Sequence, residues 1–135
     1  MSAITQFFFR RPYPSPTTWS IVRWWESRRM AYNLSVGAAG VLSLSAVALF
    51  DSLPPHARGA SLPWGGILVY AVLANLFFSV GPAVDAWICR RWGANYAPVG
   101  PALFRYGYAF AVGLTLLPIP LALMGWVIRA VGLGR

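Results

Sequence analysis

The stretch from Ala31 to Phe50, AYNLSVGAAGVLSLSAVALF, decides the fold class. Its 20 residues carry no charge. A helix of that length is about 30 Å long, which is the thickness of the hydrocarbon core of a bilayer. Two further apolar segments follow, at 64–88 and 102–133. We therefore predict an all-α integral membrane protein with three transmembrane helices.

The overall composition agrees with this prediction. Of the 135 residues, 58% are hydrophobic and only 10% are charged, whereas soluble domains have about 45–50% apolar and about 25% charged residues. This balance excludes a soluble single-domain enzyme and a disordered tail. The single cysteine, Cys89, excludes a disulfide scaffold.

Two prolines interrupt the third apolar segment. Pro118 and Pro120 each lack a backbone N–H, so they predict a kink in a helix that otherwise spans 102–133. A hairpin of two half-helices is the alternative, but each half would have only about 15 residues, which is short for a crossing.

The charge of +8 predicts an orientation. Every basic residue is an arginine, and eight of the 11 precede the first span or lie near the connection between the second and third spans. Because basic residues favour the cytoplasmic side, we expect a bacterial cytoplasmic membrane protein with its N-terminus in the cytoplasm and its C-terminus in the periplasm. A C-terminal hairpin would also satisfy this bias. The arginines favour lipid headgroups as partners over nucleic acid.

The residues before the first span form two predicted segments. Residues 1–16 carry an aromatic run and three prolines, which predict an extended arm. Residues 17–30 have the spacing of an amphipathic interfacial helix, followed by the three-span domain at 31–133. Tryptophan and arginine are typical of membrane interfaces and of protein interfaces. The candidate partner-docking residues are Phe7, Phe8, Phe9, Arg10, Arg11, Trp19, Trp24 and Trp25.

Polar and small residues within the spans are candidates for helix packing. Asn75 lies about 16 Å along the helix from Trp64 and therefore near the midplane, where an amide needs a partner. Small residues let helix backbones approach closely. The candidate packing residues are Gly37, Gly40, Asn75, Gly107, Ala111, Gly113 and Thr115.

The acidic residue of the second span is expected at the inner interface. There we predict an ion pair between Asp85 and one of the arginines Arg90, Arg91 and Arg105.

Residues for intrinsic chemistry are scarce. The chain has one histidine, His56, which would bind a metal or pigment only jointly with another subunit. No nucleophile–base set or phosphate-binding fingerprint occurs. We therefore expect no enzyme activity and no intrinsic cofactor, with lipid, quinone or pigment at subunit interfaces left open.

These observations favour an accessory, structural subunit of a larger bacterial membrane complex. An energy-transducing host, photosynthetic or respiratory, is the expected kind. The expected partners are other integral membrane subunits and membrane lipids, not nucleic acid or a soluble small-molecule substrate. The alternative is a small oligomeric transporter or channel with a midplane polar site at Asn75 and Thr115. A third hypothesis is lipid or curvature sensing by residues 17–30.

Overall fold

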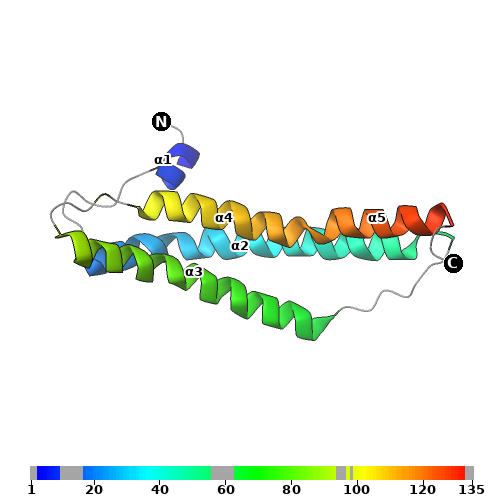
Figure 1. Cartoon of the computed structure of the whole chain (residues 1–135), viewed down its shortest axis with the longest axis horizontal. Helices are drawn as coiled ribbons and strands as arrows, with labels where there is room; N and C mark the ends of the chain where they lie inside the picture. Colours follow the sequence, from blue (N-terminus) through cyan, green and yellow to red (C-terminus); the bar gives the residue numbers. More distant parts are fainter. Residues whose placement is uncertain (1–2, 10–16, 56–62, 94–96, 98, 133–135) are drawn as a thin grey trace.

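A computed structural model describes residues 3–9, 17–55, 63–93, 97 and 99–132. The described chain consists of helices, with no strand among these residues. Figure 1 shows the helices in chain order: α1 (Ala3–Phe9), α2 (Thr18–Ser52), α3 (Trp64–Trp92), α4 (Gly100–Leu116) and α5 (Pro118–Ala130). Three candidate membrane spans result, because α2, α3 and the combined Gly100–Ala130 segment are long and apolar enough to cross a bilayer.

Helix α2 runs without a break from Thr18 to Ser52. The prediction of a separate interfacial helix at 17–30 is therefore wrong in its boundary. No glycine or proline occurs between Thr18 and Val36 to end a helix. The start is well defined, because Thr17 and Ser20 form a reciprocal capping box.

The N-terminal arm is also helical where it is described. Ala3–Phe9 forms α1, which corrects the expectation of an extended arm for these residues. This segment contains no proline, and the three expected helix breakers follow it. Arg10, Arg11 and the proline-rich stretch lie outside the described residues. A helix of 7 residues is too short to persist alone, so its packing on the rest of the chain must stabilise it.

The third span is one interrupted rod. Figure 1 shows that α5 continues in the direction of α4, so the chain does not form the alternative hairpin. The interruption falls at Leu117, whose N–H donates to Leu114 O at 3.3 Å, three residues back instead of the four of an α-helix. Helix α5 begins at Pro118. Proline is accommodated at the first position of a helix because its missing N–H would have no intrahelical partner there.

Helix α2 is the centre of the bundle and packs against α3, α4 and α5. We call the end where α2 and α4 begin and α3 ends the arginine-rich end. At this end the three spans share an aromatic core that includes Trp25, Phe78 and Phe104. Towards the opposite end α3 diverges from its neighbours (Figure 1), and no Cα atom of α3 lies within 8 Å of one in α5.

Helix α5 is fastened to α2 at the opposite end. The Arg129 guanidinium donates to Phe50 O at 2.9 Å and lies 3.6 Å from the Asp51 carboxylate. The Trp126 indole donates to Pro54 O at 3.1 Å. Thus α2 and α5 remain paired at the end where α3 diverges.

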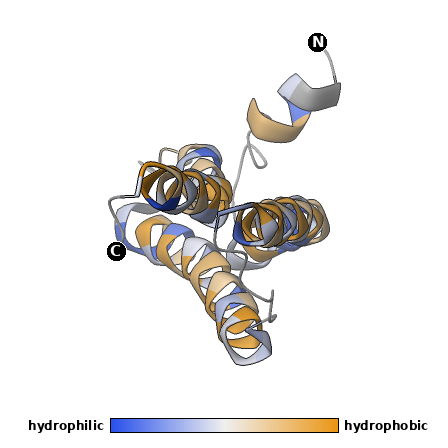
Figure 2. Cartoon of the chain, turned by 90° about the vertical axis from the view of Figure 1, so that its right-hand side faces the viewer, coloured by the Kyte–Doolittle hydropathy of each residue, from blue (hydrophilic) through white to orange (hydrophobic). Residues whose placement is uncertain are grey.

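Most of the apolar surface of the spans faces outward. In the most apolar 18-residue stretch of each span, only a small share of the residues is buried within the chain. This share is 17% in α2, 11% in α3 and 6% in the α4–α5 segment. Figure 2 shows hydrophobic residues along all of the long helices. Such a distribution suits a lipid solvent and would be unfavourable in water.

Arg28 docks α1 on the bundle. Its side chain is buried, donates to Phe7 O at 3.1 Å and to Trp24 O at 3.0 Å, and lies 3.8 Å from the centre of the Trp24 ring. Arg105 adds a second contact, with its guanidinium 4.5 Å from the centre of the Phe9 ring. The docking of α1 therefore depends on two arginines and on ring packing.

We predict that Arg28→Ala releases α1. Loss of these charge-assisted hydrogen bonds removes about 1.5–3 kcal/mol, and a helix as short as α1 then unfolds locally. Hydrogen–deuterium exchange in lipid nanodiscs should show lost protection in 3–9 with protection retained in α3. Arg23→Ala is the matched control, since Arg23 is exposed. Unchanged protection of α1 in Arg28→Ala would show that the rings alone hold it.

Candidate functional site

Trp25 joins the three spans at the arginine-rich end. Its side chain is 3% exposed, and its Nε1 donates to Asp85 Oδ2 at 3.2 Å. Its ring packs edge-to-face on Phe78 of α3 and Phe104 of α4, at centroid distances of 5.6 and 5.9 Å. Gly81 lies directly against the ring, where any Cβ would overlap the indole. One side chain of α2 therefore fixes the spacing of α3 and α4.

Asp85 is completely buried and faces the start of α4. Its carboxylate approaches Gly100 so closely that a Cβ there would overlap Oδ2. A carboxylate is favourable near a helix N-terminus because the helix dipole is positive there. Asp85 therefore combines an indole hydrogen bond with the field of α4.

The predicted ion pair of Asp85 with Arg90, Arg91 or Arg105 is wrong. At 100° per residue, Arg90 and Arg91 lie about 140° and 120° around α3 from Asp85, so they leave the bundle on other faces. Arg90 donates to Thr18 Oγ1 at 3.4 Å, and Arg105 donates to Pro101 O at 3.2 Å. Arg91 lies 6.0 Å from the centre of the Trp92 ring.

The expected docking residues divide into two groups. Phe7 and Phe8 pack against the chain's own core, and Trp24 and Trp25 belong to it. Their aromatic character therefore serves intramolecular packing. Phe9 and Trp19 are 54% and 74% exposed and remain available to a partner.

A second polar junction lies towards the opposite end. The Tyr70 hydroxyl of α3 lies 2.5 Å from Thr115 Oγ1 of α4, and Ser43 of α2 donates to Thr115 O at 2.5 Å. Thr115 is buried, as expected of a packing residue. Sequence reasoning missed Tyr70 and Ser43, because a lone hydroxyl in an apolar span carries no spacing signal.

The small residues predicted for helix packing have different environments. A Cβ at Gly40 would lie 3.8 Å from Thr115 Cγ2, and Ala111 is packed beside the core. At Gly37, Gly107 and Gly113, a Cβ would meet nothing within 4 Å. These three glycines therefore mediate no close helix contact among the described residues, which corrects that part of the prediction.

An apolar groove of about 290 Å³ opens between α3 and α4. Trp25 and Gly81 lie at one end of the lining, and Tyr70 and Leu114 at the other. Tyr32 of α2 also lines the groove. The two junctions therefore bound a space that exists because α3 diverges from α4.

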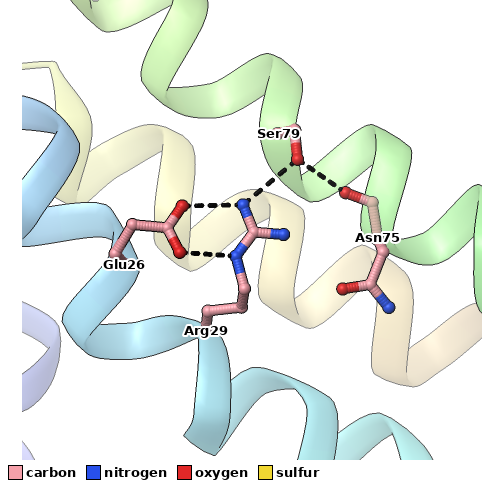
Figure 3. Close-up of polar contacts among 4 residues, drawn as sticks. All are labelled: Glu26, Arg29, Asn75 and Ser79. Atoms are coloured by element: carbon pink, nitrogen blue, oxygen red, sulfur yellow. Dashed lines mark hydrogen bonds and ion pairs between the residues drawn. The ribbon is translucent and has the colours of Figure 1, made fainter.

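A row of polar groups crosses from α2 to α3, and we call it the polar flank: Glu26, Arg29, Asn33, Asn75 and Ser79. Figure 3 shows Arg29 paired with Glu26, at 2.7 and 2.8 Å, and donating to Ser79 Oγ at 3.2 Å. Ser79 donates to the backbone oxygen of Asn75 at 2.9 Å. The row thus extends from the arginine-rich end towards the middle of α3.

Asn75 does not join the helices together. Its Nδ2 donates to Ala71 O in its own helix at 3.1 Å, and its amide lies on the side of Asn75 that faces away from Ser79 in Figure 3. Asn75 makes no hydrogen bond with Thr115, which binds Tyr70 instead. The structure therefore does not assemble the predicted midplane site of these two residues.

The described residues contain no group of three His, Cys, Asp or Glu side chains that could hold a metal ion. His56 lies outside the described residues. The described geometry offers surfaces for packing and binding: the polar flank and the apolar groove.

Comparisons with known family models, curated proteins and solved structures each gave no match. The fold defines the class by itself: an all-helical chain with three candidate membrane spans.

We predict that Gly81→Ala destabilises the protein. The added methyl group would overlap the Trp25 ring, and overpacking of this kind costs about 1–3 kcal/mol. Gly37→Ala is the matched control, because its Cβ would meet open space. Unfolding in mixed micelles should separate the two variants, and equal midpoints would contradict the close Trp25–Gly81 contact.

Thr115→Val should be more damaging than Asn75→Leu in the isolated protein. Thr115→Val removes the hydrogen bond to Tyr70, and interhelical bonds of this type contribute about 0.6 to 1.7 kcal/mol in membranes. Asn75→Leu removes only a bond within its own helix. The same unfolding assay measures both, and a larger loss for Asn75→Leu would contradict the contacts described.

Proposed function

We propose that this chain is a non-catalytic structural subunit of a larger membrane assembly, and that a transmembrane helix of a partner packs on the polar flank. The single observation that carries the proposal is the position of two amides, Asn33 and Asn75. Asn33 is exposed and Asn75 is partly exposed on helices that are otherwise surrounded by apolar side chains.

Antiparallel geometry supports placing the two amides at one level. Arg29 of α2 contacts Ser79 of α3. Asn33 lies four residues after Arg29, and Asn75 lies four residues before Ser79. Because α2 and α3 run in opposite directions (Figure 1), both steps lead the same way along the bundle, and residues four apart share a helix face. The amides therefore form one polar level.

Lipid acyl chains cannot satisfy the hydrogen-bonding groups of these two amides. Asn33 lies within the apolar segment 31–50, and Asn75 lies within the apolar segment 64–88, so both amides fall inside a predicted span. The side-chain oxygen of Asn75 accepts no hydrogen bond from the described residues. A hydrocarbon environment leaves such a group unsatisfied, whereas a partner helix with Ser, Thr, Asn or Gln supplies the missing donors.

Gly37 supports the same surface. It lies four residues after Asn33 on α2, and a Cβ there would meet nothing within 4 Å. A small residue beside a polar one is typical of sites where two transmembrane backbones approach closely. Phe9 and Trp19 extend the candidate contact surface at the arginine-rich end.

We further propose a bacterial cytoplasmic membrane with the arginine-rich end in the cytoplasm. Three spans place the two ends of the bundle on opposite sides, and the positive-inside rule then favours this orientation. The energy-transducing nature of the host is part of the same proposal.

The test is purification from native membranes in mild detergent, followed by mass spectrometry and an absorption spectrum. The proposal predicts co-migration with a larger assembly, and a pigment or haem spectrum would identify an energy-transducing host. A colourless homo-oligomer would overturn the proposal and favour the transporter alternative.

A double variant tests the surface itself. Asn33→Leu with Asn75→Leu should lose the partner while keeping the stability of the isolated chain, because neither amide hydrogen-bonds another helix among the described residues. Tyr106→Phe is the control, since it removes an exposed polar group from α4. Undiminished co-purification of the double variant would exclude the polar flank as the partner site.

A further inference from the structure

The groove between α3 and α4 has two closed ends. At the arginine-rich end, the Trp25 ring fills the space beside Gly81 and Phe104. At the other end, the Tyr70–Thr115 contact bridges the two helices. The mouth between these ends is flanked by exposed apolar side chains, including Phe77 and Phe110, which are 67% and 71% exposed.

The length of the groove is about half the thickness of the hydrocarbon core. Tyr70 and Gly81 are separated by 11 residues of α3. Leu103 and Leu114 are separated by 11 residues of α4. Eleven residues of helix rise about 16 Å, which is roughly half of a hydrocarbon core of about 30 Å. A hydrocarbon chain that spans one leaflet fits this length.

The lining is chemically suited to hydrocarbon, because almost all of it is apolar. Aromatic and aliphatic side chains form almost all of it, and the hydroxyl groups belong to Tyr32, Tyr70 and Tyr108. Tyr32 already donates to Ala74 O at 3.2 Å, and Tyr70 is engaged with Thr115. A quinone headgroup or a metal-centred pigment needs hydrogen-bond donors or a ligand.

We propose that this groove is a binding site for one acyl chain of a membrane phospholipid. The chain enters sideways from the bilayer and lies along α3 and α4, with its headgroup outside the groove. Burial of apolar surface against rigid rings drives the binding. Asp85 acts through Trp25 as a positioning residue, because its hydrogen bond holds the indole that closes the groove.

A whole partner helix does not fit inside the groove. A helix with side chains is about 10 Å wide, so a segment 16 Å long occupies roughly 1,200 Å³. The groove holds about 290 Å³. No residue of the polar flank lines the groove, so the acyl-chain site is separate from the polar flank and does not depend on the proposed partner.

Gly107 provides a sharp test. It lines the groove, and a Cβ there would meet nothing within 4 Å, so Gly107→Leu fills the groove without a clash at Cβ. Gly113→Leu is the matched control, because Gly113 also lies in α4 with open space at its Cβ but does not line the groove.

Native mass spectrometry of the full chain, released from phospholipid nanodiscs, measures retained lipid. The wild-type chain and Gly113→Leu should each retain one phospholipid. Gly107→Leu should bind the phospholipid about tenfold more weakly. Excluding two methylene groups from apolar contact weakens binding by about that factor. Equal retention by both variants, no retained lipid, or a retained isoprenoid in place of phospholipid would each overturn the proposal.

A second measurement uses only the wild-type chain. A phospholipid with a photoreactive diazirine in its acyl chain should label Leu103 and Phe77 at the groove mouth more strongly than Leu68, which is 66% exposed and outside the lining. Uniform labelling would indicate ordinary annular lipid and contradict a defined site. Partner co-purification should be unaffected by Gly107→Leu, which separates failure of this site from failure of the proposed function.

Discussion

The position of the Trp25 indole is the constraint on which the rest of the structure depends. Its nitrogen is bound by Asp85 of α3, and its ring occupies the space that Gly81 leaves open. Phe104 of α4 packs on the same ring. A hydrogen bond in this apolar setting is costly to break, since water does not replace it for the buried indole N–H. The contact therefore fixes three spans at one end.

The other end of the bundle follows from this arrangement. Helix α3 is held at the arginine-rich end and diverges from α5 towards the other end. Arg129 keeps α5 on α2, and Tyr70 reaches across the widening gap to Thr115. The divergence creates the groove on one side of α3. On the other side, the polar flank remains uncovered, and both surfaces face the surroundings of the chain.

Hydropathy was sufficient to predict the spans but not their partners. The apolar stretch 31–50 lies within α2, and the break at Pro118 divides the third span as predicted. Both follow from backbone and solvent chemistry, which act locally. The separate helix at 17–30 was wrong because the capping signal at Thr17 begins a helix that nothing ends before Ser52.

Contacts between individual residues of different helices could not be predicted without the three-dimensional structure. Asp85 was assigned to nearby arginines by depth alone, whereas the angular position around α3 directs it to Trp25 and Gly100. The side chains of other helices lie directly against Gly81 and Gly100, where a Cβ would overlap them. In the sequence these two glycines look no different from Gly107 and Gly113, where a Cβ would meet open space. A glycine indicates that space is available, and only the neighbouring helix determines what fills it.

The central claim is that α3 is held to α4 at the arginine-rich end and diverges from the α4–α5 rod at the other. Double electron–electron resonance in nanodiscs tests it most directly, with spin labels introduced in a Cys89→Ser background. One pair, Val84→Cys with Leu103→Cys, reports the arginine-rich end, and a second pair, Gly65→Cys with Leu121→Cys, reports the opposite end. We predict a clearly longer distance for the second pair. Equal distances would mean parallel spans and no groove, which would contradict this account.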